Sequence, residues 1–373
     1  MLKIIFCTDG IFPHEVGGMQ RHSRLLMEEL AKNENIKLVV IHPHQVSVFD
    51  PQLNIKEEFI SPIDKDKNYL LECYHYSKRV YAVLANYPDY IIYSQGLSVW
   101  YNIKKINQKI IVNPHGLEAY QSISLKDKLT GIPFRIIFNY LFKHSTKVVS
   151  LGGKLTEILA KRIQNSKQKI VVLPNAVILP PHFERTENSS KLNVLFVARF
   201  AHNKGIHVLL QAIKELNAEG YSDKINFHLG GKGPLFETYR THFQLKNVEY
   251  LGFISDEQLI TLYKGNDLFV LPTLFEGMPT VVLEAMSYGM PIIVSNVGAT
   301  AELVDENNGY LIEKNNVSAL KKSILDFYNL SAEEKNKLSN NSFTKIKNNF
   351  TWKLISEKHI EVFNILKSDN EKN

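Results

Sequence analysis

The sequence predicts an α/β protein built from two doubly wound domains, each with a parallel sheet. Short apolar runs rich in β-branched residues alternate with amphipathic helical stretches along almost the whole chain. This alternation is interrupted once, by a segment rich in Pro, Asn and Ser at residues 174–190, and then starts again. The chain has 373 residues, 44% of them hydrophobic and 22% charged, which is typical of a globular protein large enough for two domains.

The first domain is expected to span residues 1–175. Its predicted strands are short, apolar and bounded by turn residues, and they lie at 3–8, 37–42, 90–94, 109–114, 147–151 and 169–174. In such sheets, ligands bind beyond the carboxyl ends of the strands. Gly17 and Gly18 follow the first strand and open the first helix, where glycine lets the backbone approach a phosphate closely.

The second domain is expected to span residues 176–350. Its predicted strands lie at 192–199, 225–230, 267–272 and 291–296. The C-terminal stretch 351–366 is predicted to be an amphipathic helix that packs back on the first domain. Its apolar face is expected to hold Trp352, Ile355, Ile360, Phe363 and Leu366.

Two carboxylates eight residues apart, Glu276 and Glu284, lie in the stretch 275–296. A helix is predicted to begin near Pro279, and its N-terminus favours an anion. Eight helical residues span about 12 Å, which is the reach of a sugar, a diphosphate and a ribose. Glu276 would then meet the sugar and Glu284 the ribose diol. The alternative is that Glu284 finds its partners inside the protein, because a buried carboxylate needs them.

Glu-Gly-x-Pro, followed by Glu-Ala eight residues after the first Glu, resembles the signature of family 4 glycosyltransferases. These are retaining enzymes of the GT-B fold, in which two Rossmann-like domains face a central cleft. The resemblance covers nearly the whole chain, and the other stretches that carry it are 13–30, 114–118, 197–206, 229–234, 250–273 and 295–312. It implies transfer of a hexose-type sugar from a UDP- or GDP-sugar to a glycan or lipid-linked acceptor, without cofactor or metal. Such enzymes serve bacterial cell-surface polysaccharide or glycoconjugate assembly.

The resemblance also implies roles for individual residues. His115 and Glu276 would lie near the reacting sugar, and Arg199 and Lys204 would stabilise the departing diphosphate. Donor binding would involve Gly17, Gly18, Gly231, Phe253, Gly277, Met278, Pro279, Thr280 and Glu284. No residue in these motifs is an obvious nucleophile, so we expect front-side attack rather than a double displacement.

The positive charge of the chain is concentrated in its first half. Residues 1–180 hold 23 Lys and Arg against 15 Asp and Glu, a difference of +8, whereas the remainder holds 21 against 23, a difference of −2. Within the basic half, the stretch 129–147 places many apolar residues among Arg135, Lys143 and Lys147. Such a helix would make a peripheral contact with the anionic inner face of the cytoplasmic membrane. The alternative is a helix that covers the first sheet.

Other classes of protein lack support in the sequence. The N-terminal apolar run is too short for a signal peptide, no run is long enough to span a bilayer, and two cysteines form no disulfide framework, so a cytoplasmic location is expected. No helix-turn-helix or interleaved aromatic and basic pattern indicates nucleic-acid binding. His42 and His44 have no carboxylate at metal-ligand spacing. A sugar-nucleotide epimerase of the same fold and a non-catalytic sugar-nucleotide-binding protein stay as alternatives.

Overall fold

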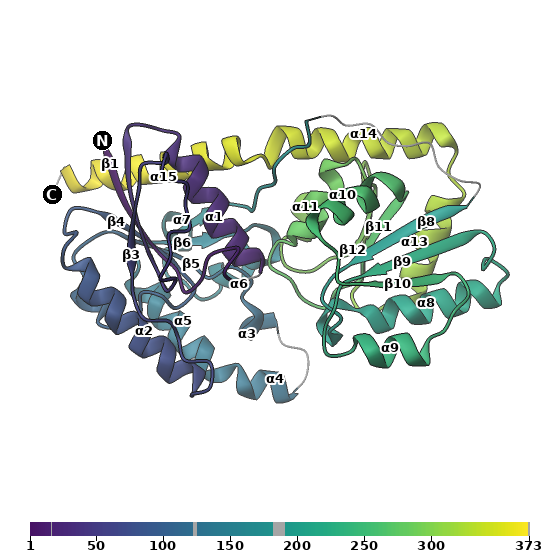
Figure 1. The fold of residues 1–373 in the computed structure, drawn as a ribbon, viewed down its shortest axis with the longest axis horizontal. Coiled ribbons are helices and arrows are strands. Elements are labelled where there is room, and N and C mark those ends of the chain that lie inside the picture. The colour runs from purple at the N-terminus through teal and green to yellow at the C-terminus, as the bar shows by residue number, and fades with distance from the viewer. Residues whose placement is uncertain (16, 122–124, 182–190, 372–373) are drawn as a thin grey trace. The chain divides into compact units, whose positions relative to one another are not determined.

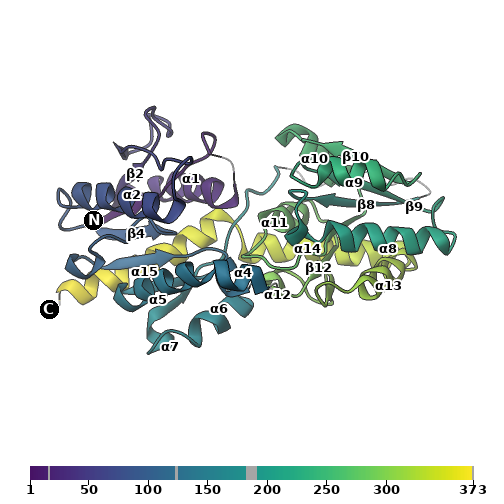
Figure 2. The ribbon, with the colours of Figure 1, turned by 90° about the horizontal axis from the view of Figure 1, so that it is seen from below.

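The computed structural model describes residues 1–15, 17–121, 125–181 and 191–371. By its contacts the chain divides into two compact units: unit 1 contains Met1–Asn175 and Trp352–Asn373, and unit 2 contains Ala176–Thr351. Each unit holds one parallel sheet with helices on both faces (Figures 1 and 2), which confirms the predicted fold class. Residues 182–190 of the predicted linker 174–190 lie outside the described part of the chain.

The sheet of unit 1 has the strand order β3-β2-β1-β4-β5-β6-β7. Its strands are β1 Leu2–Cys7, β2 Ile36–His42, β3 Ile55–Phe59, β4 Ile91–Gln95, β5 Ile110–Asn113, β6 Lys147–Ser150 and β7 Ile170–Val172. Its helices are α1 Gly18–Ala31, α2 Tyr69–Leu84, η1 Ile103–Lys105, α3 Glu118–Gln121, α4 Leu125–Thr130, α5 Ile132–His144, α6 Gly153–Ala160, α7 Ser166–Lys169 and α15 Trp352–Glu371. The direction of winding reverses between β1 and β4, so the loops after these strands diverge and leave room for a ligand.

The sheet of unit 2 has the strand order β10-β9-β8-β11-β12-β13. Its strands are β8 Leu192–Val197, β9 Ile225–Gly230, β10 Val248–Gly252, β11 Leu268–Leu271, β12 Ile292–Ser295 and β13 Gly309–Ile312. Its helices are η2 His202–Lys204, α8 Ile206–Ala218, α9 Phe236–His242, α10 Asp256–Gly265, α11 Thr280–Ser287, α12 Thr300–Leu303, α13 Val317–Tyr328 and α14 Ala332–Asn349. Here the winding reverses between β8 and β11.

The ten strands predicted from the sequence are present, with ends shifted by at most two residues. The three strands that were missed, β3, β10 and β13, all lie at sheet edges. An edge strand is covered less completely than a central one, so its residues need not all be apolar. The sequence of β3, IKEEF, carries two glutamates and none of its residues is fully buried.

Helix α15 completes unit 1, where it packs against α1, β1 and β4 (Figure 1). Its buried residues are Trp352, Ile355, Ser356, His359, Phe363 and Leu366. The prediction had placed Ile360 on this face, but Ile360 is only half-buried and His359 lies there instead. The spacing of three and four residues from Trp352 to Leu366 favours position 359 over position 360.

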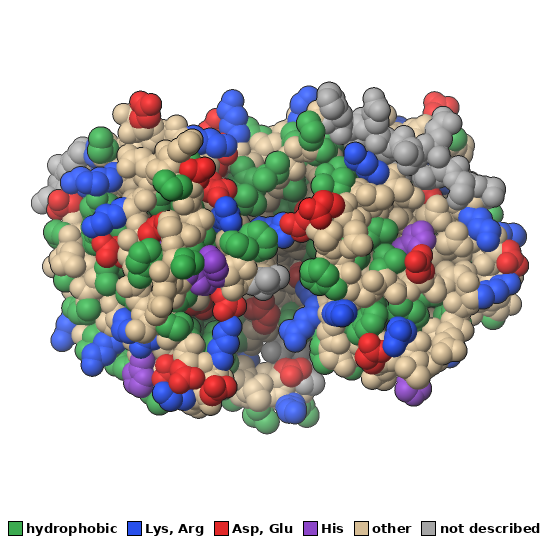
Figure 3. Space-filling view, viewed as in Figure 1, with side chains coloured by type: hydrophobic (Ala, Val, Ile, Leu, Met, Phe, Trp, Pro, Cys, Tyr) green, Lys and Arg blue, Asp and Glu red, His purple; other side chains and the backbone are tan. Residues whose placement is uncertain are grey.

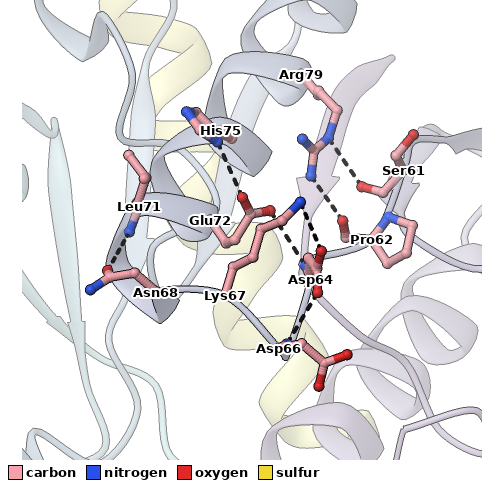
Figure 4. Close-up of polar contacts among 10 residues, drawn as sticks. All are labelled: Ser61, Pro62, Asp64, Asp66, Lys67, Asn68, Leu71, Glu72, His75 and Arg79. Atoms are coloured by element: carbon pink, nitrogen blue, oxygen red, sulfur yellow. Dashed lines mark hydrogen bonds and ion pairs between the residues drawn. The ribbon is translucent and has the colours of Figure 1, made fainter.

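The N-terminus of α2 is held by polar contacts between the helix and the loop that precedes it (Figure 4). Asn68 caps the helix by accepting a hydrogen bond from the Leu71 amide at 3.1 Å. Glu72 pairs with His75 at 3.2 Å, and Arg79 donates to two backbone carbonyls of the preceding loop at 3.1 and 2.9 Å. Because these side chains satisfy each other and the backbone, the cluster fixes the loop between β3 and α2.

Candidate active site

In unit 2, the loops after β8 and β11 flank the point where the winding reverses. The first loop carries Arg199 and Lys204, and the second carries Glu276. The two loops come close together at Gly205, which has a φ of 71°. A Cβ atom there would overlap the backbone carbonyl of Pro272. The close approach therefore requires glycine at position 205.

An ion pair joins the two loops. Lys204 Nζ lies 2.5 Å from Glu276 Oε1, and the two side chains are 25% and 10% exposed. The Thr273 hydroxyl lies 3.2 Å from the same carboxylate oxygen and 2.9 Å from the carbonyl oxygen of Asn203, so it ties both loops. Sequence reasoning missed Thr273, although it is the first hydroxyl-bearing residue after β11. The pair places one cation and one carboxylate at the end of the sheet where ligands of such folds bind.

Arg199 lies in the same loop as Lys204, two residues after the end of β8. Its side chain is exposed. No hydrogen bond or ion pair of its guanidinium to another described residue is present. A guanidinium in this state is free to make paired hydrogen bonds to phosphate oxygens.

The segment Gly277–Thr280 leads from Glu276 into α11. Pro279 is the residue before the helix rather than its first residue, and Met278 is buried, so only the backbone of Met278 is left to meet a ligand. The segment is held by the loop after β12: the Ala299 amide donates to the carbonyl of Gly277 at 2.8 Å. The N-terminus of α11 therefore follows Glu276 closely in the sequence, and the hydrogen bond from Ala299 holds the segment between them in place.

Glu284 is half-buried on α11, and the Tyr263 hydroxyl from α10 donates to its Oε2 at 3.1 Å. Tyr263 is itself buried and stacks on Tyr288 with ring centroids 5.6 Å apart. The sequence left open whether Glu284 has partners inside the protein, and Tyr263 is one such partner. Sequence reasoning missed Tyr263 because a tyrosine in a predicted helix is usually a residue of the hydrophobic core.

Two further predicted donor-binding residues follow neighbouring strands of unit 2. Phe253 comes directly after β10 and is 73% exposed, which leaves a flat ring for a planar ligand to stack on. Gly231 comes directly after β9, and its amide donates to the carbonyl of Gly252 at 2.7 Å. This bond fixes the loops after β9 and β10 to each other.

In unit 1, the predicted residues again follow strands on either side of the reversal. Gly17 precedes α1, Gly18 is the first residue of α1, and His115 follows β5. Gln95, the last residue of β4, accepts a hydrogen bond from His115 Nε2 through its Oε1 atom. The His115 amide donates to the Asn113 side chain at 3.0 Å. Sequence reasoning missed Gln95, which holds the His115 ring in place.

The backbone around His115 is strained. His115 and Leu117 have φ angles of 56° and 54°, in the left-handed region. The other described non-glycine residues with positive φ are Asn102, Asn165 and Asn315, and asparagine tolerates this conformation. A buried leucine there is an outlier, and such strain is concentrated at functional sites.

The half-buried His115 lies against the buried His22 of α1, with ring centroids 5.4 Å apart. Burial lowers the pKa of His115 to about 3 and also lowers the pKa of His22. Both rings are therefore neutral near pH 7, and His115 can act there as a hydrogen-bonding group but not as a cation. Among the described residues, no group of three or more His, Cys, Asp or Glu side chains is placed to hold a metal ion.

The predicted membrane helix 129–147 corresponds to the end of α4 and to α5, but Lys147 is the first residue of β6. The apolar residues of this stretch face two ways. Ile137 and Leu141 are buried, whereas Ile132 and Ile136 are 42% and 63% exposed. Arg135, one of the cations of that stretch, donates to two backbone carbonyls at 2.8 and 2.7 Å and holds α5 to the segments before it. No helix within the described residues is long and apolar enough to span a bilayer.

Two protein-family models divide the chain between them. The model described as Glycosyltransferase Family 4 matches residues 16–179, and the model described as Glycosyl transferases group 1 matches residues 181–345. The protein is therefore a glycosyltransferase with the GT-B type of fold. More particularly, the chain belongs to glycosyltransferase family 4.

Curated relatives agree with this assignment. An uncharacterized glycosyltransferase, MJ1178 of Methanocaldococcus jannaschii, is 28% identical over 66% of this chain and 66% of its own length, so the match spans about two thirds of that relative. The capsular polysaccharide biosynthesis glycosyltransferase CapM of Staphylococcus aureus is 28% identical over 47% of each chain.

Solved structures agree on the fold. Sucrose-phosphate synthase from Thermosynechococcus elongatus superposes with a TM-score of 0.82 at 19% identity, covering 99% of this chain and 100% of that one. Anabaena HepE in complex with UDP and glucose superposes with a TM-score of 0.67 at 15% identity, covering 98% of this chain and 100% of that one.

Proposed function

We propose that the protein is a retaining, metal-independent glycosyltransferase that moves a hexose-type sugar from a UDP- or GDP-sugar to a glycan or lipid-linked acceptor. The observation that carries the proposal is the Lys204–Glu276 pair at the reversal point of unit 2, with Arg199 in the same loop. A sugar nucleotide has hydroxyls for the carboxylate and a diphosphate for the cations. The family and the UDP complex of HepE support a nucleotide-sugar donor.

Each predicted residue has a task in this proposal. Arg199, Lys204 and the N-terminus of α11 bind the diphosphate and stabilise the negative charge that grows on it as the glycosidic bond breaks. Glu276 accepts hydrogen bonds from the donor sugar, and Glu284 accepts them from the ribose. Phe253 stacks on the base. In unit 1, the glycines at 17 and 18 let the backbone approach a phosphate, and neutral His115 forms hydrogen bonds to a sugar.

The proposed reaction uses no protein nucleophile. The acceptor hydroxyl attacks the anomeric carbon from the face that the diphosphate leaves, and the departing diphosphate oxygen takes the acceptor's proton. The new glycosidic bond then keeps the configuration of the bond that breaks. The two cations stabilise the leaving group in the way that a metal ion would. Transfer should therefore be unchanged when a chelator removes divalent cations.

We further propose a role in bacterial cell-surface polysaccharide assembly at the inner face of the cytoplasmic membrane, which the resemblance to CapM supports. Four aliphatic side chains of α4 and α5 support membrane contact because they are exposed at a spacing of four, three and four residues, and they are Leu125, Leu129, Ile132 and Ile136. Lysines 126 and 128 lie among them. An apolar stripe beside cations suits an anionic bilayer surface.

The experiment that tests the proposal has two steps. Thermal shifts are measured against a panel of nucleoside diphosphates, and the matching sugar nucleotides are then incubated with and without candidate acceptors. Release of nucleoside diphosphate that increases with an acceptor is expected. Interconversion of the donor sugar without transfer would favour an epimerase, and binding without any turnover would favour a sugar-nucleotide sensor.

A further inference from the structure

A basic groove with a volume of about 630 Å³ lies in unit 1, and neither His115 nor the glycines at 17 and 18 line it. Helices α5, α6 and α7, near which it opens, lie close together in Figure 2. Its lining residues are Asn139, Phe142, Lys143, Thr146, Lys147, Arg162, Ile163, Gln164, Asn165, Gln168, Lys169 and Leu366. Lys147 is the first residue of β6 and Lys169 directly precedes β7, so the groove is at the amino ends of the strands. His115 follows the carboxyl end of β5. The groove and His115 therefore lie at opposite ends of the strands of one sheet.

The groove contains four cations and no carboxylate. Lys143, Lys147, Arg162 and Lys169 line it, and no Asp or Glu does. None of the four forms an ion pair with a carboxylate in the described part of the chain. Their hydrogen bonds are to backbone carbonyls: Lys147 donates to residue 168 at 2.5 Å, Lys169 to residue 143 at 3.0 Å, and Arg162 to residue 158 at 2.9 Å. The Arg162 guanidinium also lies over the Tyr120 ring, 4.5 Å from its centroid. A carbonyl accepts a hydrogen bond but leaves the positive charge uncompensated.

This accumulation of charge affects the groups around it. Burial lowers the pKa of Lys169. Burial also lowers the pKa of His144, as do the neighbouring charges of Lys104, Lys143 and Lys169. The surrounding sequence is equally one-sided, since residues 90–172 hold 13 Lys and Arg against 3 Asp and Glu. Four uncompensated cations repel each other, and an anion in the groove would remove that cost.

We propose that this groove binds a phosphate group. A single carboxylate would neutralise only one of the four charges. A phosphate monoester or a polyphosphate carries two or more negative charges, and it has several oxygens for the lysines, the arginine and the amides of Asn139, Asn165 and Gln164. The volume is within the range of ordinary ligand sites. The phosphate comes either from a soluble phosphate compound or from the headgroup of an anionic lipid.

The test uses inorganic tripolyphosphate as the probe and isothermal titration calorimetry as the measurement. Because the donor site also holds cations, all proteins carry Arg199→Ala and Lys204→Ala. We expect tripolyphosphate binding in this background and a loss of at least tenfold in affinity when Lys147→Gln and Lys169→Gln are added. The matched control adds Lys37→Gln and Lys78→Gln, two cations of unit 1 outside the groove, and should bind as the background protein does.

Vesicles distinguish the two sources of phosphate. If Lys147→Gln with Lys169→Gln also reduces co-sedimentation with phosphatidylglycerol vesicles, but not with phosphatidylcholine vesicles, the ligand is a lipid headgroup. If only tripolyphosphate binding falls, the ligand is a soluble phosphate compound. The proposal is overturned if the background protein binds neither probe, or if the groove and control variants weaken binding equally. Thermal unfolding of each variant confirms that it is folded. The proposal does not depend on the transfer reaction.

Discussion

Arg199 and Lys204 lie in one loop of unit 2 but in different states, since Lys204 is paired with Glu276 and Arg199 is exposed. We expect Arg199→Ala and Lys204→Ala each to reduce kcat/KM by at least about a hundredfold, or about 2.7 kcal/mol, because the leaving diphosphate loses a cation in the transition state. Steady-state transfer assays of the purified variants provide the measurement. Lys246→Ala is the control, because Lys246 is an exposed lysine paired with Asp223. Near-normal rates in the two loop variants would contradict the assigned roles.

The two carboxylates should have separable roles. Glu284→Ala should weaken binding of the nucleoside diphosphate, since the ribose diol loses its acceptor. Glu276→Ala should leave that affinity intact and reduce turnover of the sugar nucleotide. Tyr263→Phe removes the hydroxyl that orients Glu284 and should give a smaller loss in the same direction as Glu284→Ala. Calorimetric titration with the nucleoside diphosphate and with its 2′-deoxy form measures this. Equal affinity losses in all three variants would show that the roles are not divided in this way.

Sequence reasoning identified the charged residues and glycines of the site, whereas the residues that it missed are uncharged. Glu276 and Lys204 stand out from the loops that carry them, so both were predicted as functional. Thr273 hydrogen-bonds to Glu276, Gln95 to His115 and Tyr263 to Glu284, and the last two bonds join residues that are 20 and 21 positions apart in the chain. Such bonds depend on which strands become neighbours, and a single sequence does not specify that for an uncharged residue.

At the scale of elements, the loop after β8 is expected to depend on Gly205. Gly205→Ala should lower the free energy of unfolding by at least about 3 kcal/mol, because a left-handed φ and an overlap with the Pro272 carbonyl both cost energy. Gly220→Ala is a matched control, with a φ of 86° but no atom near its Cβ, and should cost about 1 kcal/mol. Urea unfolding followed by far-ultraviolet circular dichroism measures both. Similar losses in the two variants would show that the approach of the two loops is not tight.

The exposed face of α4 and α5 is expected to contact membranes. Replacing Ile132 and Ile136 together with Ser should weaken binding to phosphatidylglycerol vesicles about tenfold, since two exposed aliphatic side chains no longer enter the interface. Ile365→Ser removes an exposed isoleucine of α15 and should have no effect. Co-sedimentation at low and moderate salt measures binding. If wild-type protein does not sediment even at low salt, the membrane contact is excluded and a soluble acceptor is favoured.

The strands of both sheets and helix α5 show which elements the sequence predicts well. Central strands such as β4 and β8 are covered on both faces, so almost all their residues are buried and each contains an apolar run that is easy to find. The edge strands β3 and β10 are half-buried and were missed. In α5, the pattern of apolar residues predicted an amphipathic helix, but not that residues 132 and 136 would face outward. That outcome depends on the angle at which the helix packs, which periodicity alone does not determine.

At the scale of the whole molecule, the burial of histidines differs between the two units. On the face drawn in Figure 3, Lys and Arg side chains are interspersed with Asp and Glu side chains in both units. Among the described residues, the buried histidines His22, His42 and His359 belong to unit 1, and His115 in the same unit is half-buried. In unit 2, burial lowers the pKa of His207, whose ring stacks on His202. Acid should therefore affect unit 1 more than unit 2.

His359 shows the direction of the effect. Burial lowers its pKa to about 4, against about 6.5 in an unfolded chain. Between these pH values, the unfolded chain binds a proton that the folded chain does not bind. The free energy of unfolding therefore falls as pH decreases from about 6.5, and the loss ends near the folded pKa. For His359 alone, the decrease from pH 8 to pH 5 is about 2 kcal/mol. Burial raises the pKa of Asp9 in the same unit, which offsets part of the loss at the acidic end.

Tryptophan fluorescence can follow unit 1 separately, because the two tryptophans of the chain, Trp100 and Trp352, both lie in it. In urea titrations, the fluorescence midpoint should be lower at pH 5 than at pH 8. The remaining change in circular dichroism, which reports unit 2, should shift less. Fluorescence also gives the free energy of unfolding of unit 1 at each pH. His359→Gln should reduce the difference between its values at pH 8 and pH 5 by about 2 kcal/mol, since residue 359 no longer takes up a proton when the chain unfolds. An unchanged difference in His359→Gln would mean that other groups cause the acid sensitivity of unit 1, and equal shifts in both signals would mean that it is not confined to that unit.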